Sequence, residues 1–357
     1  MEVHVSQLVS GLILTKDVNG KTNDPIISKD TILTDEHILV LKKFLVDKVE
    51  VSKIHANGKK CKPKMLEMTN GLEANRKLTF HEYYDNALIK YKDYFNQWKN
   101  NVPINISEIR EFLLPLIEAS MENESILFRL HQYATKEDYL YHHSLSVSLL
   151  ASYLARKMGF EKGESIQVGL AGLLSNVGMA KVDPNILDKE DRLTYIEREE
   201  IKKHPSYSYL LVKPISIIKE SVKLAVLQHH ERLDGSGYPF GLVGDQINQY
   251  AQIVAVCDTY HAMTSERKYQ KRQSPFKAME ELRKNQFIKF DSHIVQIFIH
   301  SFTNFVLGEK VKLSNDQVGK ITFIDMDNLM TPLVMLEDDE QIYSLKDEQS
   351  VLISDFI

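Results

Sequence analysis

Five side chains that could bind a metal ion are spread along the middle of this 357-residue sequence. They are His143, His204, His229, His230 and Asp258. Imidazole nitrogens and carboxylate oxygens are the usual protein ligands of zinc, iron and manganese, and a binuclear site gathers them from several helices. The set predicts metal chemistry, provided that the fold brings these side chains together.

Asp258 is the most informative of these residues. It ends the apolar run Ile253-Val-Ala-Val-Cys-Asp. A carboxylate in such a run is costly to bury unless it meets a metal ion or another cation. The turn sequence Asp234-Gly-Ser-Gly-Tyr-Pro239 lies between the adjacent histidines and this aspartate, and it is rich in residues with special backbone preferences.

Each candidate ligand also has a simpler interpretation when it is taken alone. His143 is compatible with a hydrogen-bonded core or surface histidine. His204 and the adjacent histidine pair are compatible with helix ends, where an imidazole complements the helix dipole. Asp258 is compatible with a structural ion pair to Arg267. The order of these residues and the turn between them favour a common site.

Helical periodicity dominates residues 81–305, which contain all the candidate ligands. Apolar residues recur at helical spacing at Leu88, Tyr91, Phe95 and Trp98. Thr194, with Glu197 three residues later, forms a capping-box start for another helix. We therefore predict a mainly α fold whose central domain, residues 81–305, is helical.

The N-terminal region has a different pattern of apolar and polar residues. Short β-like runs at Val3–Val9 and Lys48–Ile54 flank a helix expected to start at Thr34. The polar, Lys-rich residues 55–80 are typical of a linker or loop. We predict a small α+β module with its linker over residues 1–80.

In the C-terminal region, residues 306–357, the pattern changes to short strand-like segments. Asn-Asp and Asp-Asp turns separate short strand-like segments, which are Val311–Leu313, Val318–Ile324, Leu333–Leu336 and Ile342–Leu345. This pattern predicts a small β domain. Because no catalytic constellation lies in it, an interaction or regulatory role is the default expectation.

Composition sets the broad class of protein. An apolar content of 43% and a charged content of 26% are typical of a folded globular chain of two or three domains. The net charge of -5 argues against non-specific nucleic-acid binding. Cys61 and Cys257 are far apart, which suits a reducing compartment. Met1–Leu14 has no basic leader and no long apolar run follows, so we predict a cytoplasmic protein with no signal peptide or membrane span.

The segment from near Asp138 to near Phe305 resembles the HD-GYP domains of the HD superfamily, the helical phosphodiesterases of bacterial cyclic-dinucleotide signalling. The segments that carry this resemblance are His229-His-Glu-Arg-Leu-Asp-Gly-Ser-Gly-Tyr-Pro239, Gly241-Leu242, Ile253-Val-Ala-Val-Cys-Asp-Thr-Tyr-His-Ala-Met-Thr-Ser265, Arg267-Lys-Tyr269, Leu193-Thr-Tyr-Ile-Glu197 and Lys203-His-Pro205. The Val3–Ile54 segment also looks like the small module that often precedes such domains in bacterial proteins.

The resemblance implies a mechanism and a set of roles. In the family, a cluster of metal ions activates a water-derived hydroxide that attacks a phosphodiester of cyclic di-GMP or, in some members, of a related cyclic dinucleotide. The residues matching family metal ligands are His143, His204, His229, His230 and Asp258. Gly237, Tyr238 and Pro239 match the signature loop beside the substrate. Arg267 matches a substrate-phosphate contact, which suits a guanidinium fork.

The sequence departs from the family at the motif that names it. Where the family reads His-Asp-Ile-Gly-Lys, this chain reads Ser175-Asn-Val-Gly-Met179. A ligand histidine is replaced by Ser175, the metal-bridging aspartate by Asn176, and the lysine by Met179. Tyr139 stands where some members have a further glutamate ligand, so a third metal ion is not expected.

These exchanges predict a metal site that has lost part of its ligands. Ser175, Asn176, His143 and Asp258 would form the damaged half, whereas the other three histidines can still hold one divalent ion of iron, manganese or zinc. We expect phosphodiesterase activity to be lost or strongly reduced, leaving a module that binds a cyclic dinucleotide or another signalling protein.

Other interpretations stay open. The chain is alternatively an active phosphodiesterase with an altered, mononuclear site, or a domain in which the pocket residues persist only for folding. A homodimer is also left open.

Overall fold

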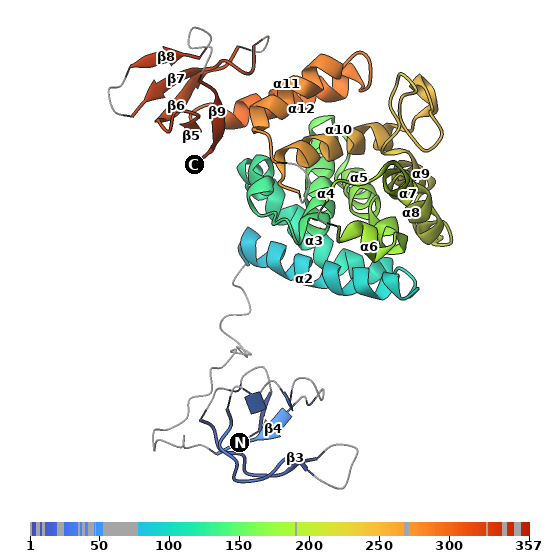
Figure 1. Cartoon of the computed structure of the whole chain (residues 1–357), viewed down its shortest axis with the longest axis vertical. Coiled ribbons are helices and arrows are strands. Elements are labelled where there is room, and N and C mark those ends of the chain that lie inside the picture. Colours follow the sequence, from blue (N-terminus) through green and yellow to red (C-terminus); the bar gives the residue numbers. More distant parts are fainter. Residues whose placement is uncertain are drawn as a thin grey trace. The chain divides into compact units, whose positions relative to one another are not determined.

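The computed structural model describes residues 2–4, 8, 11–19, 25–34, 36–37, 40–41, 46, 48–52, 78–189, 191–267, 271–325, 328–337, 341–345 and 351–357. The chain divides into two compact units, Met1–Lys77 and Leu78–Ile357. The second unit contains every candidate site residue. It is mainly helical, as the sequence predicts, and ends in a small antiparallel sheet (Figure 1).

The N-terminal unit contains two short antiparallel strand pairs. The pairs join β1 (Glu2–His4) to β4 (Lys48–Glu50) and β2 (Val18–Asn19) to β3 (Pro25–Ile27). Thr34 Oγ1 accepts a hydrogen bond of 3.3 Å from the His37 amide, in agreement with the predicted helix start. Most of the predicted linker, residues 55–77, lies outside the described residues, as do 5–7, 9 and 53–54 of the strand-like runs.

The helical body follows from Leu78 onward. Its elements are α2 (Phe80–Lys99), α3 (Ile106–Glu122), η2 (Glu124–Gln132), α4 (Tyr139–Lys157), α5 (Lys162–Leu174), η3 (Val177–Lys181), α6 (Pro184–Leu187), α7 (Tyr195–Ile201), α8 (His204–Val212), α9 (Glu220–Gln228), η4 (Gly244–Gln246), α10 (Gln249–Thr264), α11 (Pro275–Asn285) and α12 (Ser292–Val306). The predicted capping box at Thr194 and Glu197 is confirmed at the start of α7. The residues at helical spacing in α2 lie in a helix, as predicted, and Tyr91, Phe95 and Trp98 are buried.

Helix α4 is the centre of this body, and every residue from His142 to Ala155 in it is buried. It lies beside α5 because α5 presents two glycines to it: a Cβ on Gly169 would lie 2.9 Å from Ser152 Cβ, and one on Gly172 would lie 3.0 Å from the Val147 carbonyl oxygen (Figure 1). Helix α10 packs against both. This close packing fixes the helices that carry His143 and Asp258.

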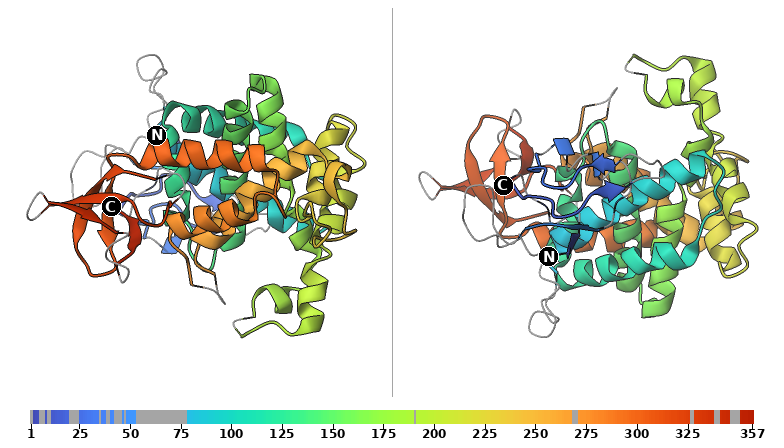
Figure 2. Two further views of the ribbon diagram at one scale, coloured as in Figure 1. Left: turned by 90° about the horizontal axis from the view of Figure 1, so that it is seen from above. Right: turned by 90° about the horizontal axis from the view of Figure 1, so that it is seen from below.

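The C-terminal sheet is formed by β5 (Lys310–Leu313), β6 (Val318–Phe323), β7 (Leu333–Leu336), β8 (Ile342–Ser344) and β9 (Ile353–Phe356), in the antiparallel order β8-β7-β6-β5-β9. The sequence predicts the first four strands but not β9, whose residues Ile-Ser-Asp-Phe carry little strand signal. The sheet lies at one end of the helical body, and α8 and α9 lie at the other (Figure 2). None of the described helices is long and apolar enough to span a membrane.

Candidate functional site

Three histidines on two neighbouring helices form the clearest metal-binding group. His204 is the first residue of α8, His229 caps the C-terminus of α9, and His230 follows it. One ligand atom from each histidine lies within 4.8 Å of those of the other two. His204 and His229 are buried and His230 is partly buried. Within the described ranges, these three are the residues placed closely enough to share an ion.

Hydrogen bonds orient two of these rings for metal binding. The Nδ1 atoms of His204 and His229 lie 2.8 and 2.9 Å from the carbonyl oxygens of Ile201 and Val226. Since a carbonyl only accepts, each Nδ1 carries the proton and each Nε2 has a free lone pair. The two Nε2 atoms face each other at 3.2 Å. Two lone pairs in this position fit a bound cation.

Burial keeps both rings neutral. It lowers the pKa of His204 to about 3 and the pKa of His229 to about 4. The pKa of His230 is also lowered, by burial and by the neighbouring His229. Neutral imidazole is the form that binds metals, so the donor set of this structure suits one divalent ion.

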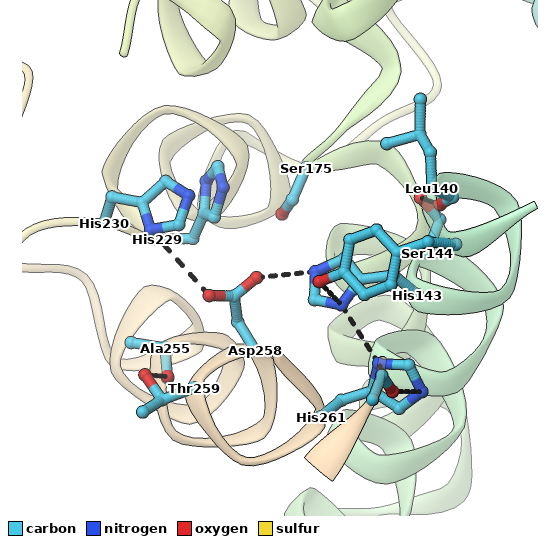
Figure 3. A network of polar contacts seen from close by, with 12 residues as sticks. Leu140, His143, Ser144, Ser175, His229, His230, Ala255, Asp258, Thr259 and His261 are labelled. Atoms are coloured by element: carbon cyan, nitrogen blue, oxygen red, sulfur yellow. Dashed lines mark hydrogen bonds and ion pairs between the residues drawn. The ribbon is translucent and has the colours of Figure 1, made fainter. Parts of the chain in front are cut away.

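His143 and Asp258 are paired with each other outside this group. His143 Nε2 lies 2.8 Å from Asp258 Oδ1, and His230 Nδ1 lies 3.8 Å from Asp258 Oδ2 (Figure 3). Burial alone would raise the pKa of Asp258, but the neighbouring His230 and the hydrogen bond from His143 hold it well below its usual range. The polar partners of Asp258 are thus histidines, and Arg267 lies instead over the ring of Tyr139.

Tyr139 and His261 occupy the other side of His143. Tyr139 Oη and His261 Nδ1 each lie 3.1 Å from His143 Nδ1, and the Tyr139 and His143 rings stack at 5.2 Å. Burial raises the pKa of Tyr139, so it is a neutral phenol that can donate to Nδ1. In this arrangement His143 donates from Nε2 to Asp258 and accepts a hydrogen bond at Nδ1.

Sequence reasoning did not single out His261. A signal for it was present, because it lies three residues after Asp258 on the same helix and therefore on the same face. Glu231, which directly follows the histidine pair, was missed in the same way.

Ser175 and Asn176 lie directly after the last residue of α5. Ser175 lies between the His229–His230 pair and His143 in Figure 3, and its hydroxyl donates a hydrogen bond of 2.7 Å to the Ala171 carbonyl. Asn176 is buried, and its Nδ2 atom has no hydrogen-bond partner.

Ser208 anchors this turn to α8. Its hydroxyl donates to the Ser175 carbonyl and accepts from the Gly178 amide, both at 2.7 Å. A Cβ on Gly178 would lie 2.2 Å from the His204 carbonyl oxygen, so only glycine allows this approach. The turn is therefore held directly against the helix that carries His204.

The signature loop is held by Glu231. This buried carboxylate accepts hydrogen bonds from the amides of Phe240 (2.7 Å) and Leu242 (3.0 Å). A Cβ on Gly237 would lie 2.4 Å from Glu231 Cα, so glycine is needed for this approach. Tyr238 stacks on His230 with ring centroids 4.7 Å apart and precedes a cis Pro239. The loop therefore closes over one side of the histidine trio.

A cavity of about 330 Å³ opens beside the site. Its aromatic residues are Phe95, Tyr139 and Tyr141, and its cationic residues are Lys99, Lys136 and Arg267. Met179 contributes to an apolar wall together with residues of α6 and α7. The Arg267 guanidinium lies 4.7 Å from the Tyr139 ring centroid, and its buried Nε has no partner. Of the predicted substrate contacts, the structure brings Arg267 to this cavity, and Gly237, Tyr238 and Pro239 to the histidine trio.

Comparison with known proteins identifies the helical domain. A family model described as HD domain matches residues 126–294. Cyclic di-GMP phosphodiesterase PA4108 of Pseudomonas aeruginosa is 32% identical over 223 residues, which cover 62% of this chain and 54% of that protein. Cyclic di-GMP phosphodiesterase PdeB of Borreliella burgdorferi is 30% identical over 192 residues, covering 54% of this chain and 50% of that protein. Residues 126–294 therefore match an HD domain, and this part of the chain is similar to cyclic di-GMP phosphodiesterases.

The fold agrees with this assignment. Bd1817, an HDG"Y"P protein from Bdellovibrio bacteriovorus, matches with a TM-score of 0.50 and 17% identity over 84% of this chain and 97% of that one. The chain spans about half the length of the two phosphodiesterases above. The HD-GYP resemblance read from the sequence is thus confirmed for the domain.

Proposed function

We propose that this chain is a degenerate HD-GYP protein of bacterial cyclic-dinucleotide signalling. It binds cyclic di-GMP or a related cyclic dinucleotide, and its phosphodiesterase activity is lost or strongly reduced. One observation carries the proposal: three histidines form a group that suits a single ion, whereas His143 and Asp258 are hydrogen-bonded to each other.

We expect loss of hydrolysis because of the residues at positions 175 and 176. Two-metal catalysis needs ligands that hold both ions and activate a hydroxide. Ser175 uses its hydroxyl hydrogen on a helix carbonyl. Asn176 is neutral, so it cannot supply the charge of a bridging carboxylate. A single ion at the histidine trio would supply positive charge to a phosphodiester oxygen.

Retained binding is supported by the cavity. Arg267 offers directional guanidinium donors to a phosphodiester, and Lys99 adds positive charge to a lining that also contains the acidic residues Glu137 and Asp188. Aromatic side chains of the same cavity suit stacking with bases. The relatives named above act on cyclic di-GMP, which makes this the first ligand to test.

An active, mononuclear phosphodiesterase is the second candidate. The facing Nε2 atoms of His204 and His229 favour it, because they suit a tightly held ion. Asp258, paired with His143, would then lie beside that ion as a base. We rank this candidate second because the ligands of a second ion are missing.

Purified protein tests the two candidates directly. We expect about one bound iron, manganese or zinc ion per chain, measurable binding of cyclic di-GMP by calorimetry, and no hydrolysis with added Mn²⁺ or Fe²⁺. The double variant Ser175→His with Asn176→Asp should gain hydrolysis. Turnover by the unmodified chain at the level of an intact HD-GYP enzyme would support the second candidate and sink the first.

The cellular compartment and the binding partner of the protein are also proposals. We place the protein in the cytoplasm, in keeping with the free, buried thiol of Cys257. A partner signalling protein or a second copy of the chain is the proposed binding partner if neither cyclic di-GMP binding nor hydrolysis is observed.

A further inference from the structure

The three histidines of the candidate metal site are not held in the same way. In His204 and His229 a backbone carbonyl accepts the Nδ1 hydrogen and fixes the ring. In the described part of the chain the ring of His230 has no hydrogen bond, and its Nδ1 lies 3.8 Å from Asp258 Oδ2. Stacking on Tyr238 is not directional enough to aim a ring nitrogen. The position of this ring therefore depends on its backbone.

The backbone around His230 is an irregular turn whose carbonyl groups need partners. His229 is the C-cap residue of α9, so its carbonyl oxygen lies beyond the regular helical hydrogen bonds. The carbonyl oxygen of His230 accepts a hydrogen bond of 3.2 Å from the Tyr238 amide. The carbonyl groups of His229 and Glu231, on either side of it, are bonded by a side chain instead.

Arg232 supplies both of those bonds from a single nitrogen atom. Its Nη1 donates to the carbonyl oxygen of Glu231 at 2.8 Å and to that of His229 at 3.1 Å. A charged donor forms stronger hydrogen bonds than a neutral one. The backbone on both sides of His230 is thereby held by one guanidinium.

Two further contacts place the guanidinium itself. Its Cζ lies 5.0 Å from the centroid of the Phe290 ring, a cation–π distance. Its Nη2 lies 3.4 Å from Thr259 Oγ1. Thr259 directly follows Asp258 on α10 (Figure 3). Arg232 thus joins the turn that carries His230 to the helix that carries Asp258.

We propose that Arg232 is a positioning residue that holds His230 in place as the third ligand of the metal ion. This inference rests on the proposed binding of one ion by the histidine trio. A guanidinium has no lone pair for a metal, so Arg232 acts through the backbone of His230 and not as a ligand. Groups that orient metal ligands in this way contribute about tenfold to a hundredfold to metal affinity.

The charge of Arg232 makes the direction of the effect informative. A guanidinium close to the site repels a divalent ion, so removal of the charge alone would tighten metal binding. Removal of the two backbone bonds would release His230 and weaken metal binding. Because these effects have opposite signs, the sign of the change in Kd distinguishes a positioning residue from a nearby charge.

The experiment uses the full chain, freed of metal with a chelator and titrated with Co²⁺, whose visible absorption gives the Kd. We expect Arg232→Met to raise the Kd at least about tenfold. Arg232→Lys should raise it less, because an ammonium can still donate to the same carbonyl groups. In the His230→Gln background, where the third imidazole is already absent, Arg232→Met should not raise the Kd further.

Lys223→Met is the matched control. Lys223 is a buried cation on α9 whose Nζ donates a hydrogen bond of 2.9 Å to the carbonyl oxygen of Lys213, the C-cap of α8. It lies six residues before His229, which is about 9 Å along a helix. This variant should lower the thermal midpoint but change the Kd for Co²⁺ by less than about twofold.

Three results would overturn the inference while leaving the metal site intact. The first is an unchanged or lower Kd in both Arg232 variants. The second is an equal rise of the Kd in Arg232→Met and Lys223→Met, because metal affinity would then follow general stability. The third is a full further rise in the His230→Gln background. Absence of Co²⁺ binding by the unmodified chain would instead overturn the metal site of the proposed function.

Discussion

At the scale of single residues, the partner of one ring nitrogen decides what a histidine can do. In His204 and His229 a backbone carbonyl takes the Nδ1 hydrogen, and Nε2 is left as a ligand. In His143 a carboxylate lies at Nε2 and a phenol at Nδ1. These histidines therefore have different hydrogen-bond partners, and we expect them to differ in their capacity for metal.

This difference predicts the metal content of two matched variants. His229→Gln should lower bound Mn²⁺ from about one ion per chain to none, because three imidazoles are needed to hold it. His143→Gln should keep the ion, because its nitrogens bond to Asp258 and Tyr139. Metal analysis after desalting measures both. Loss of the ion in His143→Gln, or two ions in the unmodified chain, would show that His143 is a ligand.

At the scale of elements, helix α7 depends on one charged cap. With α6 it belongs to the segment that stands out from the helical body in both views of Figure 2. The Glu197 carboxylate accepts the Thr194 amide hydrogen at 2.7 Å and contacts Lys189 Nζ at 2.7 and 2.8 Å. These bonds lower the pKa of Glu197 to about 2. Because residues before α7 line the cavity, its stability bears on ligand binding.

The lowered pKa predicts a pH dependence of α7. The stabilisation is fully present above the unfolded pKa of about 4.3 and is lost as pH falls towards about 2. Glu197→Gln should therefore reduce hydrogen-exchange protection of the α7 amides at pH 7, and the difference from the unmodified chain should shrink as pH falls. Glu199→Gln removes a more exposed pair with Lys202 and serves as the control. Equal protection of Glu197→Gln and the control at pH 7 would contradict the prediction.

At the scale of the whole molecule, the terminal strand joins the C-terminal sheet to the helices. The ring of Phe356 lies 5.8, 6.2 and 5.5 Å from those of Phe276, Phe302 and Phe305. Next to it, Asp355 bonds to the buried His131 at 3.3 Å and to Arg272 at 2.7 Å. The sheet and the helical body therefore share one compact unit.

This contact predicts a large stability effect far from the site. Phe356→Ala should lower the free energy of unfolding by about 3 kcal/mol, since it opens a cavity among packed rings. Phe323→Ala, on the exposed face of β6 with 55% relative exposure, should change it by no more than about 0.5 kcal/mol. Urea denaturation measures both. Similar effects of the two variants would mean that the sheet folds independently of the helices.

Local patterns in the sequence determined much of the fold. Helical spacing and the Thr194 capping box predict helices because those signals act within one or two turns. Four C-terminal strands were recognisable for the same reason. The strand β9 was not, because its place is set by ring packing against helices that lie at least 50 residues earlier in the chain.

The candidate ligands were also identifiable from the sequence, as was the loss of the family's His-Asp pair. Only the tertiary structure decided which of these side chains contact one another. The pairing of His143 with Asp258 spans 115 residues, and the contact between His143 and His261 spans 118. The proton position on each imidazole depends on those distant neighbours, and no local pattern contains that information.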